Sequence, residues 1–151
     1  MTDAPIGIDP TPLNSRAAGV VIFYGDLVLL CKRITSYQGV PTTFPGHWAP
    51  FTGSIDEGES PIACAARELK EESGKEVSLH HLTYIEEIPG DNGSLVLYAH
   101  EEGDLFVPCL NFEHTEHGYF KIDSLDSSPS PMCPKVVRAV QGFHRDRRHA
   151  W

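Results

Sequence analysis

Long hydrophobic runs are absent from this chain of 151 residues. No stretch reaches the roughly 18 consecutive apolar residues that a membrane-spanning helix requires. The first fourteen residues hold two aspartates and three prolines, and no apolar core of the kind found in secretory leaders. The sequence therefore predicts neither a membrane span nor a signal peptide. We expect residues 1–14 to form a flexible arm ahead of one domain over residues 15–151.

Cysteine is also scarce, and its four positions are scattered: Cys31, Cys64, Cys109 and Cys133. None of them forms a close pair with another, which excludes the usual spacings of zinc clamps and of small disulfide frameworks. We interpret all four as free thiols in a reducing compartment. This interpretation predicts a cytoplasmic protein.

Basic residues are few relative to acidic ones. Twelve Lys and Arg stand against twenty-one Asp and Glu, which gives a formal net charge of −9. Because binding along a nucleic-acid backbone needs surplus positive charge, a long nucleic-acid partner is not expected. A small phosphorylated ligand remains compatible with this charge, since a bound metal ion can offset its phosphates. The composition leaves both a monomer and a homodimer open.

The hydrophobic pattern predicts a mixed α+β fold. Gly25 and Asp26 lie between two apolar runs and suit a tight hairpin turn. Strands outnumber helices and the order is mixed, which favours an α/β/α sandwich with a mixed β-sheet. The predicted strands are Ala17–Tyr24, Leu27–Arg33, His47–Phe51, His80–Ile88, Ser94–His100 and Tyr119–Ile122; helices are predicted after Ser60 and Cys133, and a loop over residues 34–46.

The clearest predicted helix lies between Ser60 and Gly74. Ser60 is a preferred N-cap, Pro61 suits the first helical turn, and Gly74 favours the left-handed conformation that ends helices. Cys64 is expected to point away from the apolar stripe of this helix. The stripe is formed by Ile62, Ala65, Ala66 and Leu69.

Three glutamates of this helix, Glu68, Glu71 and Glu72, are spaced i, i+3, i+4 and share one face. A glutamate-rich helix face is most often only solvated. Crowded carboxylates are also the oxygen ligands that Mg²⁺ or Mn²⁺ prefers. The helix alone does not decide between these two interpretations.

The spacing around the glutamates resembles the Nudix box. That motif reads Gly, five residues, Glu, seven residues, Arg-Glu, an aliphatic residue, any residue, Glu-Glu, any residue, Gly and an aliphatic residue. At frequencies of ~7% per residue type, seven fixed matches would arise by chance on the order of once in a million. Lys75 departs from the motif, because an aliphatic residue is usual there. The matching residues are Gly53, Glu59, Arg67, Glu68, Leu69, Glu71, Glu72 and Gly74.

The resemblance implies a Nudix-type α/β/α sandwich that cleaves a diphosphate linked to another moiety with the help of Mg²⁺ or Mn²⁺. It makes Glu68 the first candidate for the general base. Gly53 and Gly74 would permit the turns of the motif. The implied metal ligands are Glu68, Glu71 and Glu72, with the backbone carbonyl of Thr52 or Gly53 as a further oxygen.

The resemblance also assigns Arg67 to the catalytic machinery, where an ion pair with Glu59 would orient the motif. A glutamate shortly before the strand at Tyr119 would complete the metal site, and Glu113 fits that place better than Glu116. The alternatives are a polar loop, or a zinc site on the neighbouring histidines.

Substrate contacts are expected outside the motif. Lys32 and Arg33 end a predicted strand, where relatives often place phosphate contacts, although an ordinary exposed strand end is the alternative. Trp48 or Tyr37 could stack on a nucleobase, since aromatic faces bind bases with little selectivity, or could serve only in packing.

Three functions follow from the resemblance. The first is a pyrophosphohydrolase of a nucleoside triphosphate or another nucleoside diphosphate derivative, and the intact glutamates favour it. Pro89 keeps an ADP-ribose hydrolase open, and a dinucleoside polyphosphate hydrolase is a further alternative. The second function is a non-catalytic nucleotide sensor. The third is an isomerase of the isopentenyl-diphosphate type, which the intact motif disfavours.

Overall fold

The computed structural model describes residues 15–37, 39–41, 46–90, 93–110, 114–127 and 132–149. Its strands are β1 (Ser15–Tyr24), β2 (Leu27–Arg33), β3 (Ser36–Tyr37), β4 (Val40–Pro41), β5 (Trp48–Ala49), β6 (Phe51–Ser54), β7 (Thr83–Ile88), β8 (Ser94–Glu101) and β9 (His114–Lys121). Its helices are α1 (Pro61–Ser73) and α2 (Pro134–His149), with the 3₁₀ helices η1 (Leu79–His81) and η2 (Ile122–Ser127). Within these ranges no helix is long and apolar enough to cross a membrane.

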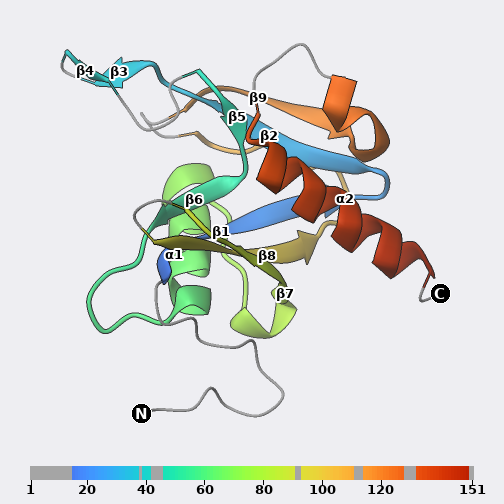
Figure 1. The fold of residues 1–151 in the computed structure, drawn as a ribbon, viewed down its shortest axis with the longest axis horizontal. Coiled ribbons are helices and arrows are strands. Elements are labelled where there is room, and N and C mark those ends of the chain that lie inside the picture. Colours follow the sequence, from blue (N-terminus) through green and yellow to red (C-terminus); the bar gives the residue numbers. More distant parts are fainter. Residues whose placement is uncertain are drawn as a thin grey trace.

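Seven strands form one mixed sheet (Figure 1). The strand order is β5-β2-β1-β8-β7, while β6 also pairs with β1 and β9 also pairs with β2. β1 and β8 run parallel, with Val20 opposite Tyr98. The other pairs in this sheet are antiparallel, including the predicted hairpin of β1 and β2. β3 and β4 pair with each other in a separate ladder.

Hydrophobic packing covers both faces of this sheet. Ile22 of β1 belongs to the same core as Leu69 of α1, whereas the next residue, Phe23, belongs to the core that contains Val140 of α2. Successive strand residues point to opposite faces, so β1 is buried on both sides and the two helices form the outer layers. The predicted α/β/α sandwich with a mixed sheet is therefore confirmed.

Helix α1 begins and ends where the sequence predicts. The Ser60 hydroxyl accepts a hydrogen bond from the backbone N–H of Ala63 at 3.2 Å, and Pro61 is the first helical residue. Gly74 adopts a φ of 80°, and its N–H donates to the carbonyl of Lys70 at 2.9 Å. These local signals set the register of every side chain on the helix.

Two strand predictions need correction. β9 begins at His114 rather than at Tyr119, because it pairs with β2 along its length, and Ile122 already belongs to η2. The predicted strand His47–Phe51 is two strands, since β5 pairs with β2 whereas β6 pairs with β1. The break falls at Pro50, which has no backbone N–H to give to a ladder.

Smaller differences concern the loops. The expected loop over residues 34–46 contains the two short strands β3 and β4. Residues 79–81 form η1, so the second hairpin begins at Thr83 rather than at His80. The expected arm, residues 1–14, and residues 91–92 of the expected hairpin turn lie outside the described residues.

The expectation for Cys64 is wrong. Its side chain points from α1 into the core and is fully buried there. Its Sγ lies 3.6 Å and 3.4 Å from the carbonyl oxygens of Gly53 and Ser54. The end of β6 covers this side of the helix, which sequence periodicity does not reveal. Burial raises the pKa of Cys64 to about 12, so this thiol is not a nucleophile at neutral pH.

Two Gly-to-Ala substitutions should have opposite effects on stability. Gly74→Ala should lower the free energy of unfolding by about 1 kcal/mol, because alanine is strained at positive φ. Gly142→Ala, inside α2, should raise it by roughly 0.5–1 kcal/mol, since its new Cβ would meet only the side chain of Arg145 at 3.7 Å. Urea unfolding of both variants measures the two changes, and a Gly74→Ala protein as stable as the wild type or more stable would contradict the assigned cap.

Candidate active site

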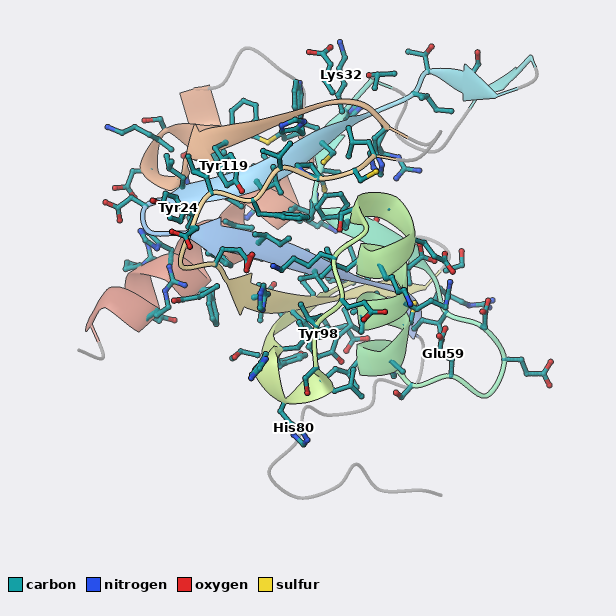
Figure 2. All side chains as sticks on the ribbon, turned by 180° about the vertical axis from the view of Figure 1, so that it is seen from behind. Tyr24, Lys32, Glu59, His80, Tyr98 and Tyr119 are labelled. Carbon is teal, nitrogen blue, oxygen red and sulfur yellow. The ribbon has the colours of Figure 1, made fainter. Side chains whose placement is uncertain are left out.

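The loop before α1 is fastened to the helix by a two-point ion pair. Arg67 donates from Nε to Glu59 Oε2 at 2.8 Å and from Nη2 to Glu59 Oε1 at 2.9 Å. Glu59 Oε1 also accepts from the backbone N–H of Asp56 at 3.0 Å, so the same carboxylate shapes the loop. Figure 2 shows Glu59 beside α1. The predicted pair of Arg67 and Glu59 is thus present.

The same guanidinium contacts the other carboxylates of the helix. Its Nη1 donates to Glu68 Oε1 at 3.0 Å and to both carboxylate oxygens of Glu71 at 3.2 Å. Its Nη2 donates to the backbone carbonyl of Ser54 at 3.0 Å and lies 3.4 Å from Asp56 Oδ2. One side chain therefore links the end of β6, the loop and α1.

These contacts change the acidity of the pair. Hydrogen bonds from Arg67 lower the pKa of Glu59 to about 2. Partial desolvation of Glu59 acts in the opposite direction but is the smaller effect. The hydrogen bonds to Glu59 are likewise the main cause that raises the pKa of Arg67. Both groups are therefore charged over the whole physiological range.

Glu68 lies directly on the backbone of Gly53. Gly53 belongs to β6, opposite Ala18 of β1, and a Cβ added to it would come within 2.0 Å of Glu68 Cδ. Any larger residue at this position would displace the carboxylate. Glycine is needed here for close approach and not for a turn, which corrects the expectation for Gly53.

Glu72 faces inward from α1. Its side chain is fully buried at 1% exposure. The pKa of the Cys31 thiol on β2 is raised mainly by the burial of that thiol and secondly by the charge of Glu72. Glu71 instead leaves 52% of its side chain exposed. The shared face predicted for the three glutamates thus runs from the buried Glu72 to the solvated Glu71. A buried carboxylate costs free energy, so packing alone does not account for Glu72.

The donor set of this cluster fits a hard divalent cation. Glu68 and Glu72 supply carboxylate oxygens, Glu71 lies next to them on the helix, and the backbone of Gly53 lies against Glu68. Within the described residues, no three Asp, Glu, His or Cys side chains already converge as a metal site. Glu71 is held by Arg67 at 3.2 Å, so the ion would draw it from this contact.

The remaining predicted residues lie elsewhere. Lys32 pairs with Glu116 across β2 and β9 at 3.7 Å, and Figure 2 shows it well away from Glu59. Trp48 packs edge-on against Phe120, with ring centroids 5.0 Å apart, in the core that faces α2 rather than α1. Arg33 ends β2 beside Lys32.

The remaining candidates are Thr52, Glu113 and, for the alternative zinc site, His114. Thr52 lies opposite Gly19 in the β1–β6 ladder, one residue before Gly53. Glu113 lies outside the described residues. His114 is buried, with its ring edge-on to that of Phe51 at 5.9 Å between centroids.

Sequence reasoning did not identify two contributors to the cluster. Asp56 reaches Arg67 from the loop, and the Ser54 carbonyl accepts from it. The acidic composition of the loop was a signal for Asp56. No sequence signal marks a backbone carbonyl, because it depends on how β6 enters the loop.

Removing the guanidinium should restore the acidity of Glu59. In Arg67→Met we expect the pKa of Glu59 to rise from about 2 towards its ordinary value near 4.5. The stabilisation from this pair is present above pH 4.5 and is lost as the pH falls towards 2, because the folded-state pKa is the lowered one. Titration of the side-chain carboxyl by ¹³C NMR measures the shift.

Lys70→Met is the matched control for this titration. Lys70 lies on the same helix but pairs with Glu76, at 2.6 Å, so the pKa of Glu59 should not change. A Glu59 that titrates near 4.5 in the unsubstituted protein would show that the ion pair does not form in solution.

Comparison with known proteins places this geometry in a family. The model of the NUDIX domain matches residues 13–140. The RNA pyrophosphohydrolase of Bartonella quintana is 38% identical over 73 residues, which are 48% of this chain and 42% of that protein. The NAD-capped RNA hydrolase NudC of Stutzerimonas stutzeri is 31% identical over 131 residues, which are 82% of this chain and 42% of that protein. The chain therefore spans about two fifths of the length of these curated relatives.

A solved structure agrees in fold. The Ap4A hydrolase of C. elegans superposes with a TM-score of 0.62 at 23% sequence identity, covering 89% of this chain and 97% of that one. At this identity the likeness shows the fold alone. The family match covers nearly the whole domain, and the motif it contains is the one whose glycine, arginine and glutamates meet at α1. The chain belongs to the Nudix family.

Proposed function

We propose that the protein is a divalent-metal-dependent hydrolase that cleaves a diphosphate bond in a nucleotide derivative. The observation that carries the proposal is the carboxylate cluster on α1, with Glu68 against Gly53 and Glu72 buried beside it. All glutamates of the motif are present, which favours an enzyme over a nucleotide sensor on the same fold. The relatives are named as a pyrophosphohydrolase and as a hydrolase of NAD-capped RNA.

The proposed metal ligands are Glu68, Glu71 and Glu72, with the carbonyl of Gly53 or Thr52 as a further oxygen. Glu113, which lies outside the described residues, stays a proposed further ligand. Mg²⁺ is the proposed ion and Mn²⁺ a substitute, because both prefer oxygen ligands. The ion, when bound, would offset the charge of the diphosphate and acidify a water molecule.

The chain's own residues orient the reacting groups. Glu68 is the proposed general base, since its carboxylate is held between Arg67 and Gly53 and can take a proton from water without reorienting. Arg67 is placed by Glu59 and serves as the positioning group for Glu68. The preformed ion pair lowers the cost of arranging the carboxylates around a substrate.

The proposed substrate is a small nucleotide, with a nucleoside triphosphate as the first choice. A net charge of −9 disfavours a long RNA chain, although two relatives are named for RNA substrates. Dinucleoside polyphosphates, as in the name of the C. elegans Ap4A hydrolase, and ADP-ribose are the alternatives. Lys32, Arg33 and Trp48 remain proposed substrate contacts. The packing of Trp48 on Phe120 makes it the weakest of the three.

Glu72→Gln should lower kcat by at least about a hundredfold at saturating Mg²⁺, because an amide is a poorer ligand for a hard cation than a carboxylate. The substitution is nearly isosteric at a buried site, so circular dichroism should show an intact fold. Glu76→Gln is the matched control, since Glu76 lies beyond α1 with an exposed side chain and should leave kcat within twofold. A Glu72→Gln protein with normal kcat would contradict the metal assignment.

A substrate panel tests the function itself. Nucleoside triphosphates including 8-oxo-dGTP, Ap4A, ADP-ribose, nucleotide sugars and a short NAD-capped RNA would be incubated with Mg²⁺, and products separated by chromatography. We expect a nucleoside triphosphate to be cleaved to the monophosphate and pyrophosphate by the wild type and not by Glu72→Gln. Preference for the capped RNA would overturn the small-nucleotide proposal, and no cleavage would overturn the hydrolase.

A further inference from the structure

Lys75, the residue that departs from the Nudix box, joins a network just beyond α1. Its Nζ lies 2.5 Å from Glu102 Oε1, and the two side chains are only 25% and 13% exposed. The same ammonium lies 4.9 Å from the centroid of the Phe106 ring. An aliphatic side chain at this position could make neither electrostatic contact.

The partner carboxylate is fixed from its other side. Glu102 Oε2 lies 3.0 Å from His100 Nε2, and the backbone N–H of Glu102 donates to the carbonyl of Phe23 at 2.8 Å. The position of Glu102 is thus set by β8 and β1. Lys75 connects this fixed point to the end of the helix that carries the glutamates.

Segment 102–110, which follows β8, has no helix or strand of its own and is held at defined points. The Tyr119 hydroxyl accepts from the N–H of Phe106 at 2.8 Å and donates to the carbonyl of the same residue at 2.6 Å. The N–H of Cys109 donates to the carbonyl of Ser73 at 2.8 Å. Figure 2 shows Tyr119 next to the trace of this segment.

The segment contacts α1 directly after the carboxylate cluster, and it carries exposed apolar side chains. Ser73, which accepts from Cys109, directly follows the buried Glu72. Leu105 and Val107 flank the anchored Phe106 and are 59% and 73% exposed. Exposed aliphatic side chains on a fixed backbone suit contact with the apolar faces of a base and a ribose.

We infer that Lys75 is a positioning residue that fixes segment 102–110 beside the carboxylate cluster and thereby sets the affinity for the nucleoside part of the substrate. This inference rests on the proposed hydrolase function. The segment carries none of the proposed metal ligands, so its displacement weakens substrate binding and leaves the chemical step nearly unchanged. The effect therefore falls on KM rather than on kcat.

The test compares Lys75→Met, Lys75→Arg and Lys70→Met. With the nucleotide cleaved best in the panel, Lys75→Met should raise KM by about fivefold with kcat within twofold. Lys75→Arg keeps the charge and should stay within twofold of the wild type in KM. Lys70→Met removes an exposed lysine of α1 and should change neither constant.

Two further readouts separate positioning from a purely structural role. Hydrogen exchange should become faster in segment 102–110 of Lys75→Met, the amide of Cys109 included, and not elsewhere in the protein. Lys75→Met combined with Glu102→Gln should raise KM no more than Lys75→Met alone, because both changes remove one contact. Faster exchange with an unchanged KM would overturn the inference, and so would a fall in kcat with KM unchanged.

Binding measurements keep this result distinct from that of the proposed function. The affinity for α,β-methylene-ADP in Ca²⁺ would be measured by calorimetry for the wild type and Lys75→Met. A wild type that binds the analogue but cleaves nothing would overturn the hydrolase, while a roughly fivefold weaker Lys75→Met would still support the positioning role. Equal affinities would overturn the positioning role alone. A wild type that neither binds nor cleaves would overturn both.

Discussion

The pairing of one guanidinium with several carboxylates is the interaction on which the site depends. Arg67 donates to Glu59, Glu68 and Glu71 and to the carbonyl of Ser54, all between 2.8 and 3.2 Å. Without it, the acidic side chains of α1 and its loop would repel each other. The fold places these groups together. The cap at Ser60 sets where the helix begins, and β6 brings Gly53 against Glu68 of the helix.

Local signals made much of this predictable from the sequence. Ser60, Pro61 and Gly74 each act within one helical turn, so the bounds of α1 follow from residue chemistry alone. The hairpin of β1 and β2 is equally local, with two residues in its turn. The carboxylate cluster followed from motif spacing, since residues three and four apart on a helix share a face whatever the rest of the chain does.

The parts that were not predicted depend on contacts between distant segments. β9 begins with polar residues, and it joins the sheet because its backbone pairs with that of β2. Cys64 is buried by β6, and the partly buried Trp48 packs against Phe120; neither neighbour is close in the sequence. Lys75 was noted as a departure from the motif. Its ion pair with Glu102 could not be predicted, because strands β7 and β8 separate the two residues in the sequence. Hydrophobic periodicity shows on which face of its own helix or strand a residue lies. It does not show which distant segment packs over that residue.

We propose above all that the carboxylates of α1 and the backbone of β6 form one divalent-metal site. A crystal soaked in Mn²⁺ and measured at an anomalous wavelength tests it most directly, because the ion's position is observed without any assay of turnover. We expect an anomalous peak bonded to Glu68 and Glu72, and the loss of that peak in Glu72→Gln. A peak elsewhere in the molecule, or the same peak in both proteins, would contradict it.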